Sequence, residues 1–107
     1  SVFNDGTNAM APPTGKVFVA ITMVTAATFD SGSGGLVADN DTNNGLEYIG
    51  TATAAHNITS GSASTATSGS GGELVDVSNT FPAGLTIYGR WTSVNPASGT
   101  IIAYIGN

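Results

Sequence analysis

The chain has 107 residues, a net charge of −5 at neutral pH, and charged side chains at only 8% of its positions. Its length suits one domain with a small core. The absence of cysteine excludes disulfides and thiolate metal sites. Two basic residues, Lys16 and Arg90, argue against nucleic-acid or anionic-membrane binding, because both need many cations. No apolar run approaches the roughly 20 residues of a membrane-spanning helix.

The first 15 residues predict an extended N-terminal arm. Pro12-Pro13 lacks two backbone donors and favours an extended conformation. Apolar anchors stand in an otherwise polar segment, so the arm is expected to dock on a partner; a passive terminus is the alternative. The expected contact residues of the arm are Val2, Phe3, Met10, Pro12 and Pro13. Residues 16–107 are then expected to form a single β domain.

Residues 16–24 give the clearest strand pattern, with apolar side chains at alternate positions on both faces. A strand that is apolar on both faces is expected to be central in its sheet, or covered by a partner. The face expected in the core carries Val17, Val19, Ile21 and Met23. The other face carries Phe18, Ala20, Thr22 and Val24.

The middle of the chain alternates short apolar stretches with loops. Ser31–Gly35 must end the first strand, because glycine and serine have little to pack. Residues 52–72 are low in complexity, mostly serine, glycine, alanine and threonine, and predict a long surface loop. Further strands are expected at Leu36–Ala38, Leu46–Thr53, Glu73–Val77 and, briefly, Asn57–Thr59.

The C-terminal part predicts a hairpin of Leu85–Val94 and Thr100–Ile105 around an Asn95–Gly99 turn. In that register Arg90 faces Tyr104 in a cation–π contact, and Trp91 faces Ala103. The expected core face carries Leu85, Ile87, Trp91, Ile101, Ala103 and Ile105. The other face carries Tyr88, Arg90, Ile102 and Tyr104, and is too apolar to be left exposed, so Tyr88, Arg90 and Tyr104 are predicted partner-binding residues.

Few residues could carry chemistry. His56 is the single histidine and has no nucleophile motif around it, so no catalytic residue and no enzymatic activity are expected. Asp39, Asp41 and Asn43 alternate as oxygen ligands do in Ca²⁺ loops, but the glycine and glutamate of an EF-hand are missing from their positions. No cofactor is therefore expected, with Ca²⁺ at Asp39/Asp41/Asn43 as the alternative to a simple polar turn.

One sequence pattern resembles a known family. Residues 81–93, FPAGLTIYGRWTS, followed by ASGTIIAY at residues 97–104, resemble the C-terminal ending of small virion structural proteins of marine tailed bacteriophages. The stretch from Phe18-Val19-Ala20-Ile21 to Thr28-Phe29-Asp30 is more weakly similar to the family's N-terminal part. The resemblance covers about a third of the chain. It implies a capsid decoration, or cement, protein with no catalytic residues.

These observations predict an all-β fold, a small antiparallel sandwich or barrel of about six to eight short strands with an extended N-terminal arm. The expected core residues are Val17, Val19, Ile21, Met23, Leu74, Leu85, Ile87, Trp91, Ile101 and Ile105. The expected partners are the major capsid protein and sister copies in a homo-oligomer on the capsid exterior, without nucleic acid or membrane. The alternatives are a tail or fibre component, a self-assembling filament subunit, or a small carbohydrate-binding module that uses aromatic rings as stacking platforms.

Overall fold

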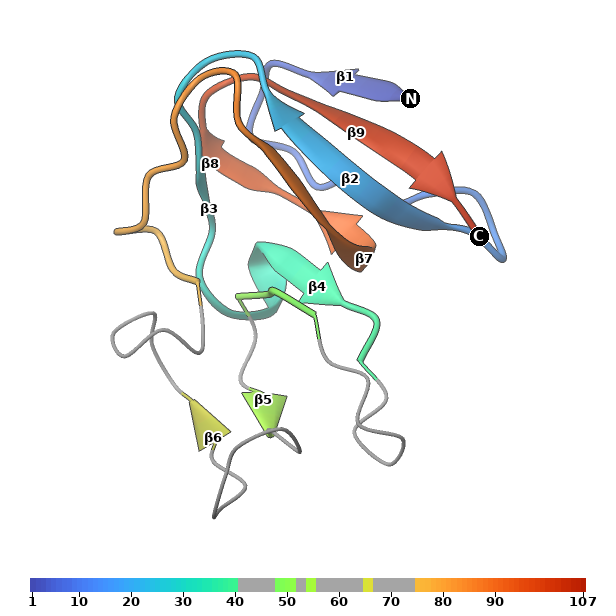
Figure 1. Cartoon of the computed structure of the whole chain (residues 1–107). Helices are drawn as coiled ribbons and strands as arrows, with labels where there is room; N and C mark the ends of the chain where they lie inside the picture. The colour runs from blue at the N-terminus through green and yellow to red at the C-terminus, as the bar shows by residue number, and fades with distance from the viewer. Residues whose placement is uncertain (41–47, 52–53, 56–64, 67–74) are drawn as a thin grey trace.

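The structure, a computed structural model, describes residues 1–40, 48–51, 54–55, 65–66 and 75–107 (Figure 1). These residues form antiparallel strands and one short 3₁₀ turn, so the prediction of an all-β fold is confirmed. The elements are β1 (Val2–Asn4), β2 (Val17–Met23), β3 (Thr28–Phe29), η1 (Gly32–Gly34), β4 (Leu36–Ala38), β5 (Ala54–Ala55), β6 (Thr65–Ala66), β7 (Thr86–Val94), β8 (Pro96–Ser98) and β9 (Ile101–Gly106).

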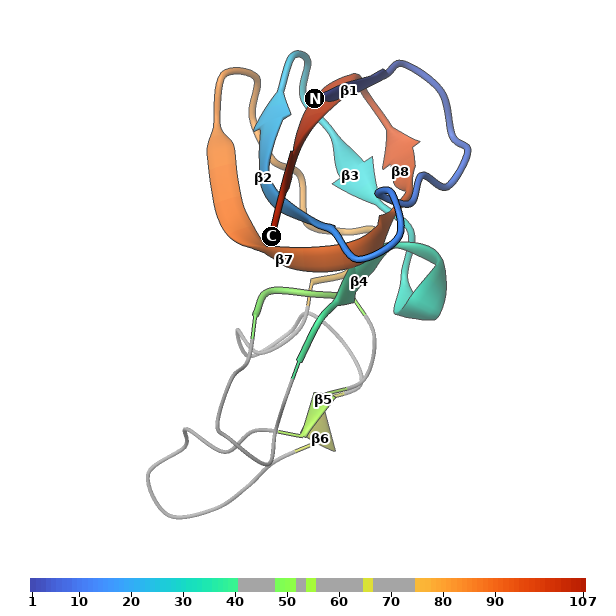
Figure 2. The ribbon, with the colours of Figure 1, turned by 90° about the vertical axis from the view of Figure 1, so that its right-hand side faces the viewer.

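The main sheet has five strands in the order β1-β9-β2-β7-β4. β2 lies at its centre, with β9 on one side and β7 on the other, as its two apolar faces predict. β3 and β8 form a second, two-stranded sheet, and β5 pairs with β6. Figure 2 shows β7 bending strongly, with β3 and β8 on the inner side of the curve. The result is a sandwich-like fold and not a closed barrel.

A β-bulge near the start of β2 decides which of its side chains enter the core. Between Phe18 and Ala20 the register shifts against both neighbouring strands, so the strict alternation of the strand is interrupted at Val19. Phe18 is consequently fully buried together with Ile21 and Met23, whereas Val19 is only half-buried. The prediction that Val19 faces the core, with Phe18 on the opposite face, is wrong for this reason.

Trp91 is the largest fully buried side chain. It lies opposite Phe18 of β2 and Ala38 of β4, and its indole N–H donates a 2.6 Å hydrogen bond to the carbonyl of Ile49. Gly89 leaves room for the ring, because a Cβ at that position would lie 2.7 Å from the Trp91 ring. The predicted role of Trp91 as a core anchor is confirmed.

The second sheet closes the core from the inner side. Phe29 of β3 is fully buried and packs edge-to-face on Phe81, with ring centroids 5.6 Å apart. The buried cluster joins residues of both sheets, which are Phe18, Ile21, Met23, Ala27, Phe29, Leu36, Ile87, Trp91, Val94, Ile101 and Ala103.

Two other predicted core residues lie at the periphery. Leu85 is 38% exposed in the turn before β7, where its N–H bonds to the carbonyl of Pro82. Ile105 is 37% exposed near the end of β9. Both predictions are wrong because Leu85 precedes β7 in a turn and Ile105 stands one residue before the end of β9, so neither belongs to the buried cluster. Leu74 lies outside the described residues.

The predicted C-terminal hairpin does not form. β2 lies between β7 and β9, so Ala103 pairs with Ile21 and Tyr104 with Ala20. The chain leaves the main sheet at Asn95, pairs with β3 through β8, and returns as β9. The sequence pattern of two strands around a turn did not reveal that a third strand separates them.

The remaining strand predictions have mixed outcomes. Leu36–Ala38 is confirmed as β4. Residues 48–51 and 75–77 are not strands, although strands were expected at Leu46–Thr53 and Glu73–Val77. The brief strand expected at Asn57–Thr59 lies outside the described residues, and β5 and β6 fall in the segment expected to be a loop.

Thr51 fixes the non-strand segment 48–51 to η1 and β4 through hydrogen bonds. Its buried hydroxyl donates to the carbonyl of Gly32 at 2.6 Å and accepts from the N–H of Leu36 at 2.8 Å. Its own N–H donates to the carbonyl of Leu36 at 2.9 Å. One side chain therefore joins η1 to β4, and residues 48–51 to both.

Trp91→Ala should lower the free energy of unfolding by about 3–5 kcal/mol, because it removes the largest buried side chain and leaves a cavity. Leu85→Ala is the matched control and should cost much less, since Leu85 is partly exposed. Urea denaturation followed by circular dichroism measures both. Equal losses in the two variants would show that Trp91 is not the centre of the core.

Thr51→Val should cost about 1–3 kcal/mol in denaturant unfolding, because it keeps the shape but leaves the Gly32 carbonyl and the Leu36 N–H without the hydroxyl. Thr92→Val is the control, because its exposed hydroxyl makes only a 3.4 Å contact with the carbonyl of Val37. A Thr51→Val protein as stable as the control would contradict the role given to this hydroxyl.

Candidate functional site

The outward face of the main sheet gathers side chains from four strands. Directly opposite residues in antiparallel strands point to the same side of a sheet, so the printed register fixes the membership of this face. One row of opposite residues runs across the sheet through Phe3, Ile102, Thr22 and Thr86. A second row runs through Tyr104, Ala20 and Tyr88. We call this surface the outer face; it consists of Phe3, Ala20, Thr22, Thr86, Tyr88, Ile102 and Tyr104.

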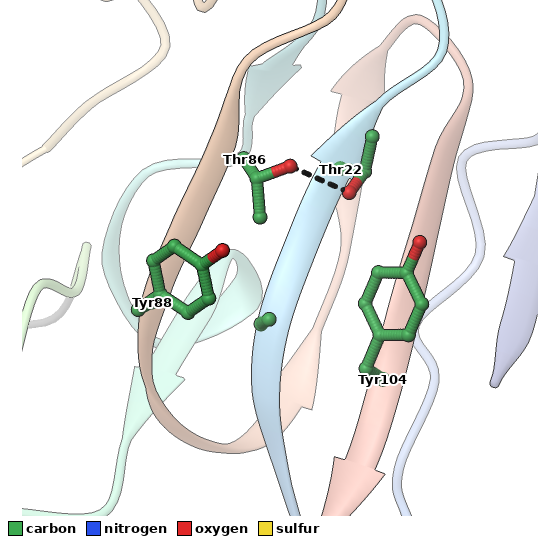
Figure 3. A pocket seen from close by; sticks show the side chains of 5 residues that line it. Thr22, Thr86, Tyr88 and Tyr104 are labelled. Carbon is green, nitrogen blue, oxygen red and sulfur yellow. Dashed lines mark hydrogen bonds between the residues drawn. The ribbon is translucent and has the colours of Figure 1, made fainter.

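Two tyrosines flank the small side chain of Ala20 at the centre of the outer face. Tyr88 of β7 is 74% exposed and Tyr104 of β9 is 39% exposed, while Ala20 between them is buried. Figure 3 shows the two rings on either side of β2. Because the rings stand on strands separated by one further strand, a slot of roughly 10 Å between backbones lies open above Ala20.

Two threonine hydroxyls close one end of the slot. The Oγ1 atoms of Thr22 and Thr86 are 2.8 Å apart and hydrogen-bonded (Figure 3). Together with Ala20 and the two tyrosines they line a depression of about 280 Å³. None of the five lining side chains is charged, so the slot offers an apolar floor, two aromatic rings and four hydroxyl groups.

Arg90 does not face Tyr104 as predicted. Its guanidinium donates to a carboxylate oxygen of Asp39 at 3.4 Å and to the main-chain oxygen of Asn107 at 2.8 Å. The cause is again the position of β2, which separates β7 from β9. The ion pair with Asp39 is partly exposed, so it contributes little to stability.

The arm lies on its own chain in this structure. Val2 and Met10 are partly buried against the core, and Met10 exchanges two backbone hydrogen bonds with Val94, of 2.8 and 2.9 Å. Phe3 points outward and is 62% exposed, so it extends the outer face. Pro12 is half-buried, and the carbonyl of the exposed Pro13 accepts the N–H of Lys16 at 3.0 Å.

The predicted Ca²⁺ loop falls largely outside the described residues. Asp41, Asn43 and also His56 are not among them, whereas Asp39 is, and pairs with Arg90. Within the described ranges no group of three His, Asp or Glu side chains is placed to hold a metal ion. The same ranges contain no helix long and apolar enough to span a membrane.

Part of the outer face was visible in the sequence. The alternation in residues 16–24 put Ala20 and Thr22 opposite the core side of the strand, and the pattern of the C-terminal strands put Tyr88, Ile102 and Tyr104 together. What the sequence did not signal is that Ala20 lies between the two tyrosines, or that Phe3 joins them.

No protein-family model, curated protein or solved structure matches this chain.

Tyr88→Ala should leave the free energy of unfolding within about 0.5 kcal/mol of the parent protein, because this ring is mostly in solvent. Thermal and urea unfolding measure the change. A loss above about 2 kcal/mol would show that the ring supports the sheet and is not free to contact a partner.

Proposed function

We propose that the chain is a non-enzymatic virion structural protein, a capsid decoration protein that binds the major capsid protein lattice through its outer face. The observation that carries this proposal is the exposure of Tyr88, Tyr104 and Phe3 on one continuous, uncharged sheet surface. The similarity of residues 81–104 to small virion proteins of tailed phages supports the choice of partner.

Exposed aromatic surface of this kind favours a protein partner. Tyrosine is enriched at the energetic centres of interfaces, since one side chain offers a large apolar area and a hydroxyl at a low cost in conformational entropy. A hydrogen-bonded sheet also holds the rings in place before binding, so less entropy is lost on docking. The outer face meets both conditions.

Such a surface would reinforce a shell by adding contacts between subunits. Apolar area buried between neighbours contributes roughly 25 cal/mol per Å², before the costs of association. When the same modest contact is made by many copies at symmetric positions, the shell as a whole gains a large resistance to internal pressure. The net charge of −5 keeps the free protein soluble until it binds.

The slot above Ala20 favours a second candidate function, carbohydrate binding. Two aromatic rings and four hydroxyls, without charge, are the groups that would stack on and hydrogen-bond to a neutral sugar. A tail or fibre position remains the alternative placement within a virion, and differs in where the copies lie on the particle.

The decisive experiment is binding to empty capsid shells of the phage that encodes the chain, stripped of this protein. The parent chain should co-sediment with the shells. Tyr88→Ala and Tyr104→Ala should each weaken binding by tenfold or more, which corresponds to about 1.4 kcal/mol. Electron microscopy of the saturated shells should show copies spread over the surface.

Val77→Ala is the matched control, because Val77 is a 52% exposed apolar residue outside the outer face. It should bind as the parent does. Shells that fail to bind the parent chain would refute the capsid assignment. Equal binding by the tyrosine variants would exclude the outer face as the contact. Binding to a glycan array that is lost with Tyr88→Ala, without shell binding, would establish the second candidate instead.

A further inference from the structure

We infer that the arm, residues 1–13, is exchanged between copies of this chain, so that β1 of one copy pairs with β9 of its neighbour. Phe3 on the outer face of each copy then comes from the neighbouring copy. The exchange needs only the chain itself, so its test is separate from binding to capsid shells.

The arm is attached to the body at two separate places. β1 pairs with β9 through three residues, in the register Val2↔Ala103, Phe3↔Ile102 and Asn4↔Ile101. Six residues after β1, Met10 forms its bridge to Val94. Thr7, Asn8 and Ala9 between these contacts are exposed. A short terminal edge strand with so few contacts belongs to the part of a fold that opens most easily.

A hinge follows the arm directly. Gly15 has a φ of 82°, and the turn between the carbonyl of Pro13 and the N–H of Lys16 separates the arm from β2. Pro12-Pro13 keeps the preceding segment extended whether or not it is docked. A change of backbone angles at Thr14 and Gly15 can therefore move the arm as one preformed unit.

The binding site that the arm leaves, the edge of β9 and the adjoining core surface, would be exposed if the arm were released. Release of the arm leaves the edge of β9 without β1 and removes the apolar cover that Val2 and Met10 give to the core. Among the described strands, β1 covers only Ile101–Ala103, so the edge at Tyr104–Gly106 is open even with the arm in place. Open edges of this kind recruit further strands.

The binding site of the arm fits the arm of a second copy. The site takes an apolar side chain facing inward at the position of Val2, a second one at Met10, and an outward residue beside Ile102. The arm of another copy meets each requirement with identical contacts. The closed and exchanged forms then make the same contacts and differ mainly in the conformation of the linker. As in domain swapping, the protein concentration decides which form is favoured.

The equilibrium between the closed and the exchanged form depends on the local concentration of copies. A short linker gives the chain's own arm an effective concentration on the order of 1 mM at its binding site. Dilute protein should therefore be mostly closed. Copies at millimolar density, in solution or side by side on a surface, should exchange.

Paired cysteines test the exchange, because the chain has none of its own. Phe3→Cys and Ile102→Cys lie directly opposite each other on the solvent side, within reach of a disulfide. A chain with both substitutions is oxidised at 10 µM and at 1 mM and analysed by non-reducing electrophoresis and mass spectrometry. The interchain 3–102 product should rise at least tenfold between the two concentrations.

Three controls make the result decisive. Thr22→Cys/Thr86→Cys, which joins β2 to β7, should give only the intrachain bond at both concentrations. Mixing singly substituted Phe3→Cys and Ile102→Cys chains should give 3–102 heterodimers. Deleting Thr14 and Gly15 shortens the hinge by about 7 Å, which hinders docking of the arm on its own chain, and should drive the doubly substituted chain into interchain products already at 10 µM.

Two outcomes would overturn the exchange. One is a doubly substituted chain that forms only the intrachain bond at 1 mM, with the deletion variant also remaining monomeric. The other is interchain products in which 3–3 and 102–102 bonds are as frequent as 3–102, because that pattern reports outer faces pressed together without exchange of strands.

Discussion

The structure depends on the hydrogen bonding of β2 on both of its edges. β7 and β9 each pair with β2 and do not pair with each other, so without β2 the sheet would separate into the pair β1-β9 and the pair β7-β4. A strand in that position needs apolar side chains on the face that enters the core, and side chains on the other face that fit between those of the two flanking strands. β2 meets this with Phe18, Ile21 and Met23 inward and with small or polar side chains, Ala20 and Thr22, outward.

The same arrangement creates the candidate site. The outward position at the centre of the sheet is an alanine, so the tyrosines of the two flanking strands stand over a shallow slot rather than a packed ridge. Two register shifts lie between Phe18 and Ala20, one against β9 and one against β7, and together they bring Tyr88 and Tyr104 opposite Ala20 while Phe18 lies opposite Trp91. Core packing and site geometry therefore depend on the same irregular part of the sheet.

The arm relates the outer face to assembly. Val2 and Met10 contribute to the core, whereas Phe3 contributes to the outer face, so one short segment links stability to the surface proposed for binding. In the exchanged arrangement, neighbouring copies complete each other's outer faces. Binding to a lattice and association between copies would then reinforce one another, because a lattice raises the local density of arms.

The sequence by itself determined the class of the fold and several of its anchors. Period-two alternation identified β2, β7 and β9 as strands and showed that β2 must be central or covered, because the face that a side chain occupies is a local property of an extended backbone. Trp91 in the core and Tyr88 with Tyr104 on the opposite face followed from the same pattern.

Only the tertiary structure decided which strands are neighbours. Strand order is set by pairings between distant segments, and no local pattern in residues 85–105 shows that residues 17–23 lie between the two strands. The bulge at Val19 likewise depends on fitting β2 to two partners at once, which reversed the assignment of Phe18. Leu85 and Ile105 are apolar and fit the strand pattern, yet both are partly exposed, because Leu85 falls in the turn before β7 and Ile105 near the end of β9, and neither joins the buried cluster.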